Sequence, residues 1–293
     1  MGESKTLYHK DYEVIKNLVS LNIPTLLSGP AGAGKNITLK QVADGLGLPF
    51  YFTNAVTQEY KLTGFIDANG TYHETQFYQA FKNGGLFFLD EMDASIPETL
   101  VILNAAIANG YFDFPTERVE AHQDFRIVGA ANTFGTGADI EYVGRNQLDA
   151  ATLDRFALIR FDYDPKVENA IADNEDISTF IQEIRRISND LELHLIVSMR
   201  ATKYLRKLQD SVPKPQALMY TLYKGLPKED ITQIYNEIKI DKNNPYVVAT
   251  GELIGIKPDP IKPKINSIIN SDTSEVAEMI RQATIEYGFI KED

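Results

Sequence analysis

The segment from residue 29 to residue 36 limits what this chain can fold into more than any other. It reads Gly-Pro-Ala-Gly-Ala-Gly-Lys-Asn, which fits the phosphate-binding pattern G-x-x-x-x-G-K-[S/T] at every position except the last. The glycines of such a loop let backbone N–H groups turn toward phosphate oxygens, and the lysine neutralises phosphate charge. The candidate nucleotide-binding residues are therefore Gly29, Pro30, Ala31, Gly32, Ala33, Gly34, Lys35, Asn36 and Ile37.

The sequence around this loop predicts a parallel α/β sheet. Residues 24–28 predict a strand before the loop, and apolar spacing over 37–46 predicts a helix after it, whose N-terminus would add its dipole to an anion site. An amphipathic helix is expected before that strand, over residues 8–19. Near-continuous apolar runs separated by helical patterns are typical of parallel strands buried on both faces, so we expect an αβα sandwich with about five strands. The other runs cover residues 50–52, 85–89, 125–131 and 157–161.

Polar residues follow two of these runs. The strand ending at Leu89 is followed by Asp90 and Glu91. Asp90 suits water-mediated coordination of Mg²⁺, and Glu91 can polarise a water for attack on a γ-phosphate. Asn132 follows the next strand and can orient that water. A strand that ends in acids and an asparagine in a turn are both common structural features, but after a phosphate loop they favour a hydrolytic site.

Asn36 is the departure from the phosphate-loop pattern, because a Ser or Thr hydroxyl usually ligates Mg²⁺ at this position. An amide carbonyl is also a hard oxygen ligand, so Asn36 and Asp90 are the candidate metal residues. Thr38 faces elsewhere around a helix and is a poor substitute. The substitution leaves open a protein that binds nucleotide without hydrolysing it.

Three arginines are candidates for contact with a γ-phosphate. Arg155, in Leu153-Asp154-Arg155-Phe156, could reach the site of a neighbouring subunit, and Arg145 is a second candidate for that position. Arg200 lies at the start of a predicted helix, where the dipole disfavours a cation and so makes an anionic ligand more attractive. Each of them could instead be an ordinary surface cation.

Composition and charge narrow the classes of partner. The formal net charge is −12 and there is no cysteine, so a broad nucleic-acid surface is disfavoured, and disulfides and thiolate metal sites are excluded. No apolar run is long enough to span a membrane, and we expect a cytoplasmic protein.

Two hairpins are predicted, over 65–72 and 111–121, and both are candidates for substrate or partner contact. They contain a single basic residue, Arg118.

The chain is expected to divide into three parts. Residues 1–164 would form the nucleotide-binding domain, residues 165–240 a small helical lid, and residues 241–293 a C-terminal extension. The extension contains the proline-rich linker 257–264 and a predicted terminal helix that carries Val276, Ile280, Ala283 and Tyr287.

These motifs resemble those of AAA+ ATPases, and within that class those of the MoxR and dynein-related group that includes the CbbQ and NorQ activases. Phage-encoded members are especially similar, including the Gly-Lys-Asn ending. The resemblance covers roughly residues 8–240. It implies a sheet of order 5-1-4-3-2, a helical lid, and a ring, usually a hexamer, with ATP and Mg²⁺ bound between subunits. It also implies that Lys35, Glu91, Asn132, Arg155 and Arg200 serve hydrolysis.

Three functions compete at this point. The first is a ring-forming, chaperone-like remodelling ATPase that acts on a protein client, often together with a partner that contains a von Willebrand A domain. The second is a motor acting on DNA, similar to McrB-type restriction NTPases, for which the hairpins offer little positive charge. The third is an assembly module that binds nucleotide and does not turn it over, motivated by Asn36.

Overall fold

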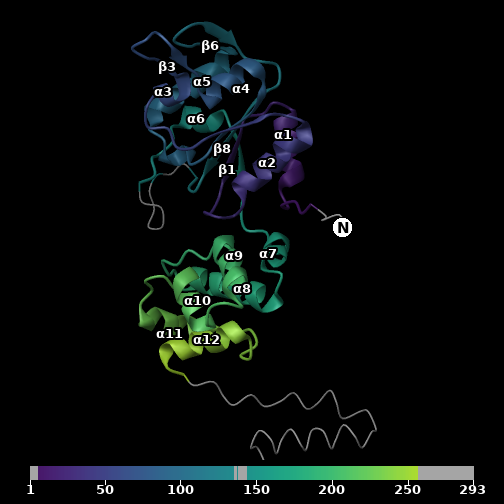
Figure 1. Cartoon of the computed structure of the whole chain (residues 1–293), viewed down its shortest axis with the longest axis vertical. Coiled ribbons are helices and arrows are strands. Elements are labelled where there is room, and N and C mark those ends of the chain that lie inside the picture. Colours follow the sequence, from purple (N-terminus) through teal and green to yellow (C-terminus); the bar gives the residue numbers. More distant parts are fainter. Residues whose placement is uncertain (1–5, 135–136, 138–143, 257–293) are drawn as a thin grey trace, which may run out of the picture. The chain divides into compact units, whose positions relative to one another are not determined.

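The computed structural model of the chain describes residues 6–134, 137 and 144–256. Within them, an α/β part built on a parallel sheet is followed along the chain by a group of helices (Figure 1). The predicted linker 257–264 and the predicted terminal helix lie outside the described residues.

The central sheet has five parallel strands in the order β2-β5-β8-β1-β9. Numbered along the chain, and read from the other edge, this order is 5-1-4-3-2, which confirms the expected fold. Each strand forms at one of the five apolar runs. Their bounds are β1 Thr25–Ser28, β2 Phe50–Thr53, β5 Gly85–Leu89, β8 Phe125–Ala131 and β9 Ala157–Arg160.

Helices cover both faces of this sheet, which explains why its inner strands β5, β8 and β1 are buried at nearly every position. Successive side chains of a strand point to opposite faces, and the neighbours Phe87 and Phe88 of β5 accordingly join different buried clusters. Phe88 packs with the helices that flank the phosphate loop, whereas Phe87 packs with α4 and α5. The helices are α1 Tyr12–Ser20, α2 Lys35–Leu46, α4 Gln76–Asn83 and α5 Pro97–Asn109.

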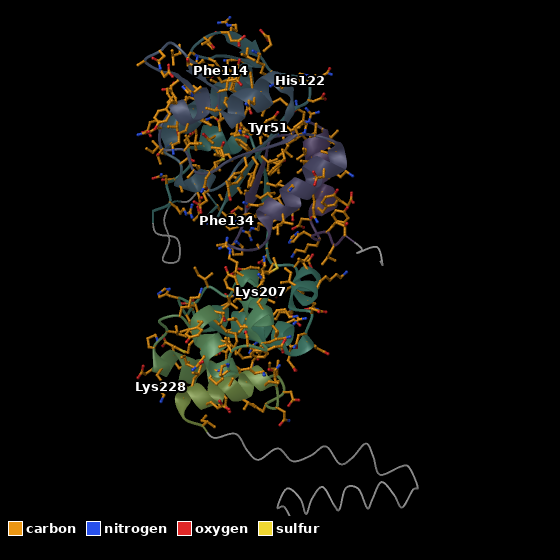
Figure 2. The ribbon with its side chains drawn as sticks, viewed as in Figure 1. Tyr51, Phe114, His122, Phe134, Lys207 and Lys228 are labelled. Carbon is orange, nitrogen blue, oxygen red and sulfur yellow. The ribbon has the colours of Figure 1, made fainter. Side chains whose placement is uncertain are left out.

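Both predicted hairpins form. Strands β3 (Phe65–Ile66) and β4 (Tyr72–His73) pair after the short helix α3 (Tyr60–Thr63), and β6 (Tyr111–Asp113) pairs with β7 (Arg118–Glu120) before β8. Phe114, between β6 and β7, is buried edge-on against Tyr78 of α4, with ring centroids 4.8 Å apart (Figure 2).

The helices after β9 share one buried core, and this core continues beyond residue 240, where the lid was expected to end. Helix α12 contributes Tyr246 and Val247 to the same cluster as Ile234 of α11. Asn244 caps α12, because its side chain accepts from the Tyr246 N–H at 2.9 Å, and Pro245 opens the helix. These helices are α7 Pro165–Ala172, α8 Glu175–Asp190, α9 Met199–Leu208, α10 Lys214–Thr221, α11 Lys228–Glu237 and α12 Pro245–Ile254.

The boundary at residue 240 was expected from the spacing of apolar residues alone. That spacing does not include the Asn244 cap and Pro245, which begin a further helix of the same core.

Among the described residues, no helix combines the length and the apolar character needed to cross a lipid bilayer.

Removing α12 should destabilise the helical group. A chain ending at residue 240 loses the buried side chains of Tyr246 and Val247. Burial of a large apolar side chain contributes about 1.5–3 kcal/mol, so the free energy of unfolding should fall by at least about 3 kcal/mol. We expect a chain ending at residue 240 to melt at a clearly lower temperature than a chain ending at residue 255, measured by circular dichroism. Equal melting temperatures would show that α12 is dispensable for this core.

Candidate nucleotide-binding site

The phosphate loop connects β1 to α2 with a backbone that needs glycine. Gly32 and Gly34 have φ angles of 74° and 103°, in the left-handed region that side chains disfavour. The N-cap residue of α2 is Gly34, which has no side chain to cap the helix that begins at Lys35. The first N–H groups of the helix are therefore left to an anion at its positive end.

Gly29 has a different reason to be glycine. A Cβ atom placed there would lie 1.8 Å from the carbonyl oxygen of Phe161, so the backbone after β9 occupies the space that any side chain would need. Among the residues the structure describes, Gly29 and Pro30 are not on the wall of the cavity in which the rest of the loop lies. Their backbone carbonyls instead accept from Lys35.

The Lys35 ammonium joins the loop to the neighbouring strand end. Its Nζ donates to the carbonyl oxygens of Gly29 at 2.6 Å, Ala131 at 3.2 Å and Pro30 at 3.3 Å, and to Oδ1 of Asn132 at 2.9 Å. All four acceptors are neutral, and within the described residues Lys35 forms no ion pair. Burial lowers the pKa of Lys35 to about 8, although Asp90 and Asp93 oppose the shift. A buried cation held only by neutral oxygens fits a site for phosphate.

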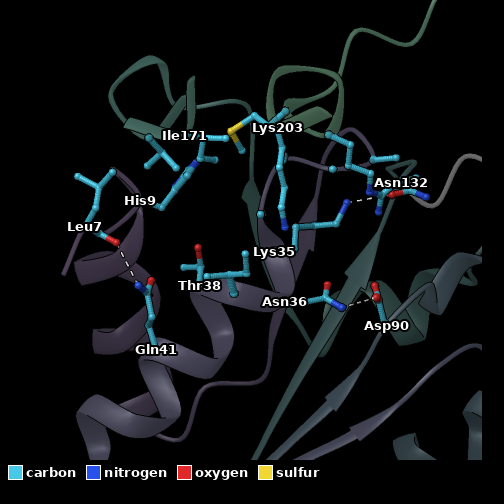
Figure 3. Close-up of a pocket in the computed structure, with 18 of the residues that line it drawn as sticks. Leu7, His9, Lys35, Asn36, Thr38, Gln41, Asp90, Asn132, Ile171 and Lys203 are labelled. Atoms are coloured by element: carbon cyan, nitrogen blue, oxygen red, sulfur yellow. Dashed lines mark hydrogen bonds between the residues drawn. The ribbon is translucent and has the colours of Figure 1, made fainter. Parts of the chain in front are cut away.

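Asn36 and Asp90 meet at the mouth of this site. The Asn36 Nδ2 donates to Oδ2 of Asp90 at 2.9 Å (Figure 3). An ionised carboxylate only accepts hydrogen bonds, so the amide must present its NH₂ group to Asp90, which leaves its carbonyl Oδ1 for another partner. A Ser or Thr hydroxyl in this position would likewise donate its proton and keep its oxygen for a metal. The pair therefore fits Mg²⁺, which needs one or two protein oxygens besides phosphate and water.

Glu91 and Asn132 lie at the same edge of the sheet, as expected from parallel strands. Both line the cavity with the phosphate loop. Glu91 also contacts Arg145, whose Nη2 is 3.4 Å from its Oε1. The other nitrogen of Arg145, Nη1, is 3.2 Å from Oδ1 of Asp93. Asp93 is fully buried and was not identified from the sequence, because its partners follow a different strand.

Arg155, like Gly29 and Pro30, is a predicted site residue that does not line this cavity among the described residues. It follows α6 (Ala150–Asp154) and its guanidinium donates back to the carbonyl oxygen of Ala151. In the described part of the chain, the cavity wall does not include Arg155. Among the described residues Arg145 does not line the cavity either, but it contacts Glu91, which does.

Arg200 is brought to the phosphate loop by the N-terminus of α9. Ser198 caps this helix, and a Cβ on Gly32 would lie 3.0 Å from the Ser198 Cβ and 3.5 Å from the Arg200 Cγ. Arg200 also helps lower the pKa of Lys35 through charge repulsion. Lys203, one turn further along α9, lines the same cavity. Lys203 was not among the predicted site residues, although its spacing of three from Arg200 on a helix was a usable signal.

The cavity continues beyond the phosphate loop to a more apolar end. Its volume is about 410 Å³, and Leu7 and Ile171 line this end together with His9 (Figure 3). The His9 ring stacks on Phe161 with centroids 3.9 Å apart, its Nδ1 accepts from the Asp11 N–H and its Nε2 donates to the Asp162 carbonyl oxygen. Both ring nitrogens are engaged, so His9 presents a fixed wall. No motif in the sequence marks these residues.

Part of the chain is similar to known proteins. Residues 24–156 match the family described as AAA domain (dynein-related subfamily). An uncharacterized protein of Staphylococcus aureus strain USA300 is 26% identical over 261 residues, covering 77% of this chain and 93% of that protein. An uncharacterized protein of Staphylococcus saprophyticus is 26% identical over 195 residues, covering 62% of this chain and 68% of its own.

Two solved structures show weaker similarity. The crystal structure of NtrX from Brucella abortus has a TM-score of 0.49 at 16% identity and covers 87% of this chain and 67% of its own. That of a putative ATPase from Cytophaga hutchinsonii has a TM-score of 0.45 at 15% identity, with 80% and 92% covered.

Nucleotide affinity should fall at alkaline pH. Phosphate binding favours the charged form of Lys35 and so raises its pKa above the value of about 8 in the free protein. Nucleotide affinity is therefore highest below about pH 8, the pKa of Lys35 in the free protein. It falls, by at most about tenfold per pH unit, as the pH rises above this value. We expect calorimetry with ADP to show weaker binding at about pH 9.5 than at pH 7, with proton uptake near pH 8. Lys35→Met should bind weakly at every pH, and an equal affinity of the wild type at both pH values would contradict the assignment.

Asn36 should carry the metal dependence of nucleotide binding. Asn36→Leu keeps the size of the side chain and removes both amide functions, so we expect Mg²⁺ to strengthen ADP binding about 10- to 100-fold less than in the wild type. Asn36→Thr restores an oxygen and a proton donor and should retain the effect. The measurement is ADP affinity with Mg²⁺ and with a chelator, and an undiminished Mg²⁺ effect in Asn36→Leu would rule this metal site out.

The phosphate loop, the two acids after β5 and the polar end of β8 all fall within the matched segment. Residues 24–156 of this chain are thus similar to an AAA domain of the dynein-related subfamily.

Proposed function

We propose that this chain hydrolyses ATP as an AAA+ remodelling ATPase of the MoxR group, working as a ring on a protein client. One observation carries the hydrolytic part of the proposal. The Lys35 ammonium binds the Asn132 side chain at 2.9 Å, in a cavity that Asp90 and Glu91 also line. This one cavity therefore contains a cation for phosphate, a metal ligand, a carboxylate and an amide that can orient a water.

Each residue has a defined part in this reaction. Bound MgATP would supply the phosphoanhydride bond that is cleaved. Lys35 neutralises phosphate charge, and Asn36 with Asp90 holds the metal. Glu91 accepts a hydrogen bond from the attacking water, and the Asn132 amide orients that water. The more apolar end of the cavity, at Leu7 and Ile171, suits the ring of an adenine base.

The position of Arg155 supports a ring. Its guanidinium follows α6, outside the cavity of its own chain, so a neighbouring copy is the partner whose γ-phosphate it could reach. In a closed ring, usually a hexamer in the MoxR group, every copy would complete the site of the next.

A protein client is favoured by the β3–β4 hairpin. Its Phe65 and Ile66 are 46% and 48% exposed, and the hairpin offers apolar contact without basic residues. A chain with a net charge of −12 is also poorly suited to a DNA track. The resemblance to the MoxR group suggests two further parts of the proposal. One is a partner protein that contains a von Willebrand A domain, and the other is a phage origin for this chain.

Asn36 favours one competing function, an assembly module that binds nucleotide and does not hydrolyse it. Its contact with Asp90 weighs against that reading, because the amide reproduces both functions of the usual hydroxyl. Phosphate release distinguishes the two.

Glu91→Gln should abolish turnover and preserve binding. The amide keeps the shape of the side chain but cannot act as a base, so we expect steady-state phosphate release to fall about 100-fold or more, with ATP affinity close to that of the wild type. Glu98→Gln, an exposed glutamate in the first turn of α5, is the matched control. Phosphate release that is unchanged in Glu91→Gln would overturn the hydrolytic assignment, and release that is strongly stimulated by DNA would favour a DNA motor.

Sharing of the site between copies is tested by mixing. Arg155→Ala should abolish turnover with ATP binding largely intact. Mixed with Glu91→Gln, it should regain activity, because some sites then combine an intact Glu91 with an intact Arg155 from the neighbouring copy. Loss of ATP binding in Arg155→Ala would instead place this residue in the fold of its own chain.

A further inference from the structure

Arg145 lies between two carboxylates at the end of β5. Its guanidinium is 3.4 Å from Glu91 and 3.2 Å from Asp93, through different nitrogens. The side chain is only 12% exposed. A planar guanidinium presents donors in a fixed fork and can therefore hold two acceptors in a fixed relative position.

The backbone beside Arg145 is fastened to the same turn of the same chain. The Asn146 N–H donates to the Asp93 carbonyl oxygen at 2.6 Å, and the Asn146 side chain donates to the Ser95 carbonyl oxygen at 2.9 Å. Swinging Arg145 toward another subunit would break the ion pairs and leave Asp93 buried without its cation, which is unfavourable. Arg145 is thus committed to its own chain's site.

Asp93 extends this contact to the water-orienting strand end. Its Oδ2 accepts from the N–H groups of Asn132 at 3.1 Å and Thr133 at 3.0 Å, and from the Thr133 hydroxyl at 2.9 Å. Its Oδ1 accepts from Arg145. One fully buried carboxylate therefore ties Asn132 to Arg145.

Glu91 has little else to orient it. Its backbone is in the left-handed region at φ 51°, which is unfavourable for a residue other than glycine. Its side chain is 41% exposed, and in the part of the chain that the structure describes its carboxylate has Arg145 as its hydrogen-bond partner. A half-exposed carboxylate on an unfavourable backbone needs such a contact to keep one orientation.

We infer that Arg145 is a positioning residue that fixes Glu91 directly and Asn132 through Asp93, so that both groups face the attacking water together. This inference rests on the proposed ATP hydrolysis. It also separates the two arginines that the sequence left as alternatives: Arg155 remains the candidate for contact with a neighbouring copy, and Arg145 serves its own.

Arg145→Lys is the sharpest test. A lysine keeps the positive charge beside the buried Asp93, but its single ammonium cannot hold both carboxylates as a fork does. We expect a melting temperature and an ATP affinity close to those of the wild type, with kcat about 10- to 100-fold lower, because misplacement of reacting groups lowers the rate rather than the affinity. Arg126→Lys is the matched control, because among the described residues the Arg126 side chain donates to the backbone carbonyls of Gln123 and Phe125. If Arg145 only stabilised the fold, Arg145→Lys would keep wild-type turnover, and that result overturns the inference.

Mixing assigns Arg145 to a subunit. Arg145→Lys mixed with Glu91→Gln should release phosphate no faster than Arg145→Lys alone, since every site then lacks either Arg145 or Glu91. Recovery of activity in this mixture would overturn the inference and assign Arg145 to the neighbouring copy's site. Wild-type phosphate release is measured alongside: its absence refutes the proposed function, whereas wild-type turnover with an equally active Arg145→Lys refutes this inference alone.

Discussion

The hydrogen bonds of the Lys35 ammonium hold the candidate site together. They connect the start of α2 to the loop before it and to the end of β8. This connection is available because β1 pairs with β8 in parallel, with Ser28 opposite Ala131, so the phosphate loop and Asn132 leave the sheet side by side. β5 is the next strand, and its acids emerge at the same edge. Without this strand order, the same residues would be scattered over the molecule.

The site also shows how an acidic chain can attract an acidic ligand. Although the net charge is −12, Lys35, Arg200 and Lys203 line one cavity. Arg145 and Arg200 each help to lower the pKa of Lys35, so the cations repel one another when no anion is bound. A bound polyphosphate would relieve that repulsion, which makes the concentration of like charge itself a source of binding free energy.

The parts of the fold and site that could be predicted are those encoded by short stretches of sequence. Buried parallel strands appear as apolar runs, and residues directly after a strand end must lie at the sheet edge, which sufficed for Asp90, Glu91 and Asn132. Asp93 and its pairing with Arg145 could not be predicted, because the pairing depends on how a loop far along the chain folds back. The apolar end of the cavity escaped for the same reason, since Leu7 and Ile171 are brought together only by the tertiary structure. The helical core extends beyond the expected end at residue 240, because the Asn244 cap and Pro245 begin a further helix that apolar spacing alone does not predict.

The close approach of Phe161 to Gly29 affects how defects in the phosphate loop should be interpreted. A side chain at position 29 would collide with the backbone next to β9 and so disrupt the packing of the loop on that strand. Substitutions at Lys35 remove a charge and its hydrogen bonds but create no collision with the backbone. Defective alleles at these two positions would therefore belong to different classes: the first would reduce the amount of folded protein, and the second would leave abundant protein that is inert. A screen that scored only activity would merge them, and would credit Gly29 with a contact to phosphate that its position in the fold does not require.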